Sequence, residues 1–319
     1  MLESVDPAVV GLSKERLTHI TSWLEAQVAD GKLAGASALI ARRGKVAYLQ
    51  SAGFADRENG KLMDADTIVR IYSMSKSVTT VAAMMLYEQG CFQLDDPVAK
   101  YLPEFAETPV WDGGDAPITA VSAQQAPMQV KHLMNHTSGL TYGFMSTTPV
   151  DAQYRDREIE FQSRSESLAD IVTRLARIPL LCQPGTQWNY SVATDVLGRL
   201  VEVWSGMSLA AFFQQRIFAP LGMTDTGFSV PEQGQDRFAA LYAPAVGGDM
   251  STVGSASATV PQDQRGGLKL MEGSSQSVYF TEPLSHSGGG GLVGTIGDYA
   301  RFCQMLVNLG ELEGERLLS

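Results

Sequence analysis

The chain has 319 residues, of which 44% are hydrophobic and 18% are charged. This composition is typical of a globular protein with a substantial core and argues against a disordered chain. The length fits one large domain or two joined ones. A formal net charge of −11 would repel phosphate backbones and anionic lipids, so we expect neither a nucleic-acid nor a membrane partner. The expected partner is a small molecule.

The cysteines and the N-terminus bear on the compartment. Cys91, Cys182 and Cys303 are odd in number and lack metal-ligand spacing, so the sequence predicts neither a disulfide framework nor a zinc site. The N-terminus lacks the basic start and apolar run of a secretory signal, and no segment approaches the ~20 apolar residues that span a bilayer. These features favour a cytoplasmic location.

The first fifty residues predict a helix followed by a hairpin. Apolar residues recur on one helical face between Ser13 and Asp30, and Ser13 can cap that helix. Short strand-like runs follow at 37–41 and 46–50, and Gly44 in the connection favours a tight turn. The fold therefore begins with an amphipathic helix and an antiparallel pair.

The remainder of the chain is mainly helical. Residues 75–90 are apolar nearly all round, which predicts a buried helix. Further helices are predicted at 168–178, 194–205, 209–217 and 298–309. Residues 244–283 have little periodicity and are predicted to form a loop. The order predicts an α+β fold, with residues 1–72 and 226–319 forming a sheet part and residues 73–225 a mainly helical part.

The strongest local feature is a Ser-x-x-Lys step, Ser73 to Lys76, where a strand-like segment enters the apolar helix. Spacing of three places the hydroxyl and the amine on one helical face. The helix N-terminus favours a developing alkoxide, and a buried neutral amine could accept the serine proton. The alternative is a capping Ser73 and a surface Lys76 that extends its amine to water.

A second feature is Tyr190, which follows a Pro-Gly turn and an aromatic residue and precedes a helix. Core packing with a hydrogen-bonded phenol is the commoner role of such a tyrosine. Together with the Ser-x-x-Lys step, it suggests instead a phenol that moves protons beside an ammonium.

Five segments in this order resemble the serine β-lactamase-like hydrolases, and most closely the esterases similar to class C β-lactamases, the family VIII carboxylesterases. They are SMSK (73–76), VKHLMNHTSGL (130–140), PGTQWNYS (184–191), FAPLGMTDTGF (218–228) and GGGGLVGT (288–295). The resemblance covers nearly the whole chain. It implies an α+β, β-lactamase-like fold in which an antiparallel sheet is flanked by helices and a mainly helical region is inserted.

The resemblance also implies roles for individual residues. Ser73 would form an acyl-enzyme, with its backbone amide as one oxyanion donor, while Lys76 and Tyr190 share the general-base work. Tyr142 matches a tyrosine that lines the acyl pocket, although a packing role is the alternative. Candidate substrate contacts in the glycine-rich segment are His286, Ser287 and Gly288, for which a solvated loop is the alternative. No cofactor and no metal is implied.

The chain departs from the family pattern at two places. β-Lactamases proper have an asparagine two residues after the tyrosine, but Val192 stands there, which favours esters over lactams. The family's third motif lies on a strand beyond the last helix, and the sequence ends at Ser319 before it. We therefore expect a fragment of a longer protein, with the last strands missing and an open sheet edge beside Ser73.

Three other patterns are weaker. Residues 289–294 have Gly-x-Gly-x-x-Gly spacing but follow no apolar strand, so a loop near the site is expected instead of a nucleotide site. His132 and His136 have the spacing of helical zinc ligands, without a third ligand. Residues 206–210 approach a nucleophile elbow but lack its last glycine.

The sequence therefore predicts a serine hydrolase that cleaves short-chain carboxylic esters through an acyl-Ser73 intermediate. Alternatives with the same fold are a β-lactamase or D-alanyl peptidase and an acyltransferase. An alternative of another class is a non-catalytic binding or scaffolding relative, against which the joint presence of Ser73, Lys76 and Tyr190 argues.

Overall fold

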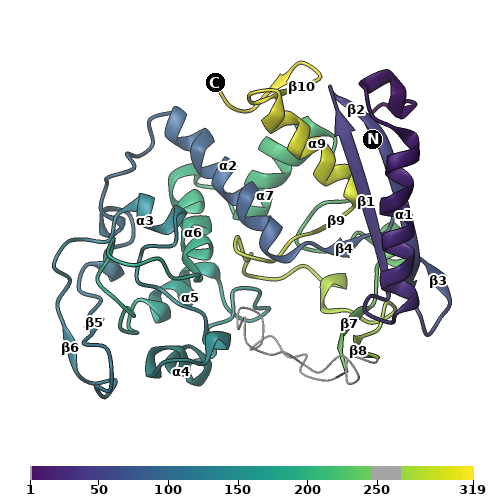
Figure 1. The fold of residues 1–319 in the computed structure, drawn as a ribbon. Coiled ribbons are helices and arrows are strands. Elements are labelled where there is room, and N and C mark those ends of the chain that lie inside the picture. Colours follow the sequence, from purple (N-terminus) through teal and green to yellow (C-terminus); the bar gives the residue numbers. More distant parts are fainter. Residues whose placement is uncertain (1, 246–266) are drawn as a thin grey trace. The chain divides into compact units, whose positions relative to one another are not determined.

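The computed structural model describes residues 2–245 and 267–319, which form two compact units (Figure 1). The sheet unit contains Met1–Arg70, Phe218–Thr281 and Val293–Arg316. The helical unit contains Ile71–Ile217, Glu282–Leu292 and Leu317–Ser319. The sequence-based division did not include the return of Glu282–Leu292 to the helical unit.

The sheet unit begins with helix α1, Lys14–Ala29, and the antiparallel strands β1, Gly35–Arg42, and β2, Lys45–Asp56. Ser13 caps α1, since its hydroxyl accepts a hydrogen bond from the Arg16 amide at 3.2 Å. Gly44 turns the hairpin with a φ of 76°, a left-handed conformation that glycine adopts without steric cost. The predicted helix and hairpin are confirmed.

Short strands complete this unit. β3, Lys61–Leu62, pairs with β2, and within the described residues β1 has a strand on one side only. Helix α9, Ile296–Val307, packs against β1, and α1 packs against both long strands (Figure 1). Three further antiparallel pairs are β4, Val69–Arg70, with β9, Val293–Gly294; β7, Leu241–Pro244, with β8, Leu268–Glu272; and β10, Glu311–Leu312, with β11, Glu315–Arg316.

Strand β8 corrects part of the loop predicted at 244–283. Its residues pair with β7, so that Tyr242 lies opposite Leu270, and a 3₁₀ turn follows at Val278–Phe280. The prediction for residues 246–266 lies outside the described residues. A five-residue strand is too short to show a clear period, and its pairing depends on a segment distant in sequence.

The helical unit is organised around two helices that pack against each other, α2, Ser75–Glu88, and α6, Ala193–Ser205 (Figure 1). Helices α3, Val130–Met134, and α5, Leu168–Leu175, pack on α6, while α7, Leu209–Phe213, contacts α2 and α6. The unit also contains α4, Pro149–Asp156, and the strand pair β5, Val110–Trp111, with β6, Val121–Ser122. The chain leaves α7 through a π-helix, Gln214–Phe218, into α8, Ala219–Leu221.

In the described part of the chain, no single helix is both long and apolar enough to cross a membrane; one pair bent by 77°, Ala193–Ser205 with Leu209–Leu221, passes that test when the two are combined, by length and composition only.

Replacing one buried residue of α6 should show how strongly this helix stabilises its unit. Leu197 is 0% exposed, so Leu197→Ala should lower the free energy of unfolding by about 2–5 kcal/mol through lost burial and a cavity. Val203 lies on the same helix and is 37% exposed, so Val203→Ala should cost less than about 1 kcal/mol. Urea unfolding followed by circular dichroism compares them, and equal losses would contradict the observed burial.

Candidate active site

Ser73 lies at the junction between strand β4 and helix α2. A 3₁₀ turn, Tyr72–Met74, separates the two elements, and Tyr72 has a φ of 43°. A left-handed backbone is costly for a bulky side chain, and such strain clusters at functional sites. The turn leaves Ser73 exposed and places Lys76, half-buried, in the first turn of α2.

The structure brings the three predicted catalytic side chains into contact. The Ser73 Oγ lies 2.5 Å from the phenol oxygen of Tyr190, 117 positions later in the chain. The Lys76 Nζ donates to the Ser73 Oγ at 3.2 Å and lies 4.8 Å from the centre of the Tyr190 ring. The hydroxyl thus contacts two groups that can carry protons, and nucleophilic catalysis by serine requires at least one such group beside it.

The alternative reading of Ser73 and Lys76 does not fit this geometry. The residues at the N-cap positions of the 3₁₀ turn and of α2 are Ile71 and Met74. Lys76 is half-buried, and its amine also donates to the carbonyl oxygen of Gly289 at 2.5 Å. The Lys76 amine is therefore held within the site by two hydrogen bonds.

The turn that contains Gly289 is held by a buried carboxylate, Asp195 of α6. The Asp195 Oδ1 accepts hydrogen bonds from the Ser287 hydroxyl at 2.5 Å and from the Gly289 amide at 2.9 Å. Burial raises the pKa of the Asp195 carboxyl, whereas these two hydrogen bonds and the Lys76 charge act in the opposite direction. Asp195 is not among the site residues predicted from the sequence, where its signal is an acidic side chain within an apolar helix.

Aromatic rings surround the trio. The Tyr142 ring lies 5.3 Å from that of Tyr190 and stacks on Phe144 at 4.6 Å. Burial raises the pKa of the Tyr142 phenol, so this group stays protonated at neutral pH. Trp188 lies 6.5 Å from Tyr190, nearly parallel to it, and is 68% exposed. Phe144 and Trp188 add an apolar surface that the sequence analysis did not assign.

The predicted substrate contacts in the glycine-rich segment make hydrogen bonds within the protein. His286 is buried, and its Nε2 lies 2.9 Å from a carboxylate oxygen of Glu282. Ser287 donates to Asp195, and the Gly288 carbonyl accepts from the Thr79 hydroxyl at 2.7 Å. The structure places these residues in the framework of the site, and their contact with substrate stays a prediction.

His132 and His136 do not share a helix. The His132 Nδ1 accepts from the Gln129 amide and closes the start of α3, which ends at Met134. His136 follows with a φ of 59°, its Nδ1 3.3 Å from the Ser191 hydroxyl and its ring 5.0 Å from that of Tyr190. In the described residues, no cluster of three or more histidine, cysteine or acidic side chains could hold a metal ion.

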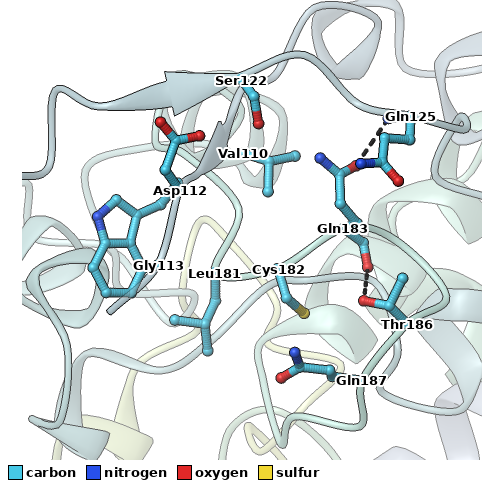
Figure 2. Close-up of a pocket in the computed structure, with 11 residues that line it drawn as sticks. Val110, Asp112, Gly113, Ser122, Gln125, Leu181, Cys182, Gln183, Thr186 and Gln187 are labelled. Carbon is cyan, nitrogen blue, oxygen red and sulfur yellow. Dashed lines mark hydrogen bonds between the residues drawn. The ribbon is translucent and has the colours of Figure 1, made fainter. Parts of the chain in front are cut away.

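A separate pocket of about 330 Å³ flanks the segment that leads to Tyr190 (Figure 2). Residues from the segment 110–125 line one side, and the other side is lined by Leu181, Cys182, Gln183, Thr186 and Gln187. Gln183 ties the two sides together, since its Oε1 accepts from the Gln125 amide at 2.9 Å (Figure 2). The lining residues do not include the trio.

Comparisons with known proteins identify the family to which the chain is similar. The Beta-lactamase family profile matches residues 20–319. A Mycobacterium tuberculosis protein is 33% identical over 289 residues, which cover 91% of this chain and 66% of that protein. Esterase EstB of Burkholderia gladioli is 32% identical over 307 residues, covering 93% of this chain and 72% of the esterase.

Solved structures show the same likeness. EstCE1, described as a hydrolase with promiscuous acyltransferase activity, superposes with a TM-score of 0.71 at 30% identity, covering 94% of this chain and 74% of EstCE1. The predicted α+β, β-lactamase-like fold class and the family resemblance are confirmed. The chain spans about two thirds of the length of the M. tuberculosis relative.

His136 should make stability depend on pH. Burial, and secondarily the Lys76 charge, lower the pKa of His136 from its usual 6.5 to about 4. The unfolded chain then binds the proton more tightly than the folded chain does. The contribution of the neutral His136 to the free energy of unfolding is therefore fully present above pH 6.5 and is lost as the pH falls towards 4. Urea midpoints between pH 7.5 and 4 should fall more steeply for the wild type than for His136→Asn, and parallel curves would contradict the expectation.

Proposed function

The chain belongs to the Beta-lactamase family, and from this premise we propose that it is a serine carboxylesterase that cleaves short-chain esters through an acyl-Ser73 intermediate. The observation that carries the proposal is the joint contact of the Ser73 hydroxyl with Tyr190 and Lys76. The similarity to EstB and EstCE1 supports hydrolysis of esters, as their names state.

In the proposed acylation, the Ser73 Oγ attacks the ester carbonyl as its proton passes to the Tyr190–Lys76 pair. To accept this proton, the pair must begin with one proton fewer than it can carry. It can do so as a Tyr190 phenol with a neutral Lys76 amine, or as a Tyr190 phenolate with a Lys76 ammonium. The Lys76 Nζ lies 4.8 Å from the centre of the Tyr190 ring, and both groups contact the Ser73 hydroxyl. The pair then returns the proton to the departing alkoxide, which leaves as an alcohol.

Deacylation repeats these steps with water as the nucleophile. Tyr190 takes a proton from the water, the acyl carbon–Oγ bond breaks, and Ser73 regains its proton as the carboxylic acid departs. The Ser73 backbone amide is proposed as one donor to the oxyanion of both tetrahedral intermediates. The exposed position of Ser73 supports access of both ester and water.

The side chains around Ser73 support an apolar ester as the substrate. Tyr142, Phe144 and Trp188 offer ring surfaces to acyl or alcohol groups. Val192 is buried and has no amide to bind a lactam side chain, which favours the esterase over the lactamase alternative.

The cytoplasmic location and the expectation of neither nucleic-acid nor membrane partners stay predictions.

An acyltransferase is the second candidate, because the EstCE1 description includes that activity. The acyl-Ser73 intermediate would be the same, and an alcohol would replace water in its second half. Product analysis with p-nitrophenyl butyrate in water and in dilute methanol separates the candidates: butyric acid indicates hydrolysis and methyl butyrate indicates transfer.

Removing the nucleophile should abolish turnover and covalent labelling. With p-nitrophenyl butyrate the wild type should release p-nitrophenol, whereas Ser73→Ala should show no release above the uncatalysed rate. Tyr190→Phe keeps the ring and loses the phenol oxygen, so kcat should fall about 10²- to 10⁴-fold. Intact mass after treatment with a fluorophosphonate should show one adduct on the wild type and none on Ser73→Ala. Equal labelling of the two proteins would reject the assignment.

Trp188 should contribute to binding more than to chemistry. Trp188→Ala removes an exposed ring beside Tyr190, so KM for an aryl ester should rise about two- to tenfold while kcat changes little. A matched control is Trp23→Ala on α1, which removes another exposed tryptophan, 57% accessible, and should leave KM unchanged. A KM equal to that of the wild type in both variants would exclude Trp188 from the substrate site.

A further inference from the structure

Asp195 is a buried carboxylate in an apolar helix. It is 2% exposed, and its neighbours Val196 and Leu197 on α6 are fully buried. Burying a carboxylate costs free energy unless hydrogen bonds compensate it. The donors that compensate it belong to the turn formed by Ser287–Gly289, so this cost is linked to the conformation of that turn.

The turn is held from two helices of the same unit. Asp195 of α6 accepts from Ser287 and Gly289, while Thr79 of α2 donates to the Gly288 carbonyl at 2.7 Å. Within the turn, the Gly291 amide donates to the Ser287 carbonyl at 2.9 Å. The peptide groups of 288 and 289 are therefore fixed relative to α2, the helix that carries Lys76.

Gly289 connects Asp195 to the catalytic trio through its own backbone. Its amide donates to Asp195, and its carbonyl accepts from the Lys76 amine, which also donates to Ser73. An unbroken series of hydrogen bonds therefore connects the Asp195 carboxylate, the Gly289 backbone, the Lys76 amine and the Ser73 hydroxyl. A shift of the Gly289 peptide would move the acceptor that orients the Lys76 amine.

Residue 289 must be glycine for this arrangement. A Cβ atom there would lie 2.4 Å from the Asp195 Oδ2 and 2.9 Å from its Cγ, closer than packed atoms approach. A side chain at this position would displace the carboxylate or the turn. The glycine that resembled part of a nucleotide motif thus serves the close approach of Asp195 to the backbone.

We propose that Asp195 is a positioning residue: by accepting two hydrogen bonds it fixes the Gly289 carbonyl, which holds the Lys76 amine toward Ser73. The inference rests on the proposed function, since it assigns the purpose of a buried group within that site. Asp195 acts through hydrogen bonds. An asparagine at this position should therefore replace it, because the side-chain amide oxygen can accept both hydrogen bonds.

The experiment compares four variants of the full chain with the wild type. Asp195→Ala removes both hydrogen bonds, Asp195→Asn retains an acceptor oxygen, and Ser287→Ala removes one donor. Asp298→Ala is the control, because Asp298 is also buried and accepts from the Asp225 amide and the Thr226 hydroxyl, none of which belongs to the site. Readouts are kcat and KM with p-nitrophenyl butyrate, the rate of fluorophosphonate labelling, and the melting temperature.

We expect Asp195→Ala to lower kcat and the labelling rate about 10- to 100-fold with KM within about twofold, as misplaced catalytic groups do. Asp195→Asn should recover both rates to within about threefold of the wild type. Asp298→Ala should melt earlier while its kcat at a temperature where it is folded stays that of the wild type. This kcat-specific loss with rescue by asparagine separates positioning from a merely structural role.

A folded Asp195→Ala with wild-type kcat, or an Asp195→Asn as slow as the alanine variant, would overturn the inference. Where Asp195→Ala does not fold, Ser287→Ala decides: a three- to tenfold lower kcat with KM within about twofold supports the inference, and an unchanged kcat or a change in KM alone rejects it. A wild type that takes up no fluorophosphonate would instead reject the proposed function itself, so the two failures are distinguishable.

Discussion

Lys76 donates hydrogen bonds to the Ser73 hydroxyl and to the Gly289 carbonyl, and each acceptor is fixed by a different part of the helical unit. Ser73 is set by the 3₁₀ turn before α2, and Gly289 by its contact with Asp195 of α6. A half-buried amine needs such acceptors, because burial of an unpaired cation is costly. The geometry of the site therefore depends on where this one amine is held.

The packing of α2 against α6 relates the residues that act together. Lys76 and Thr79 lie on α2, Asp195 lies on α6, and Tyr190 lies in the segment just before α6. Well-packed helices resist small displacements, since each side chain fills the space left by its neighbours. The same contacts that stabilise the unit thus keep the phenol of Tyr190 within 2.5 Å of the Ser73 hydroxyl.

Aromatic rings and a neutral histidine lie beside the trio. His136 has its pKa lowered to about 4 and is neutral at pH 7, so it adds no second positive charge beside Lys76. Tyr142, Phe144 and Trp188 present rings. Under the proposed function, these apolar surroundings favour a neutral ester over an anionic substrate, because an anion would lose its hydration among them.

The features that depend on neighbouring residues can be predicted from the sequence. Ser13 capping α1, Gly44 turning the hairpin, and the i, i+3 spacing of Ser73 and Lys76 follow from local backbone geometry. The order of the five motifs indicates the family, and the family resemblance assigns the role of Tyr190. No local rule predicts that Tyr190 contacts Ser73, because 117 positions separate them.

The contacts between distant segments follow from the fold and from no local pattern. Asp195 has its role because the turn at 287–289 donates to it, and that turn is distant in sequence. Strand β8 lies in the predicted loop because its pairing partner, β7, lies outside the short window in which a period can be recognised. His132 and His136 had helical zinc spacing, but α3 ends at Met134 between them. In each case a hydrogen bond or backbone turn, set by packing of remote segments, fixed the role of the residue.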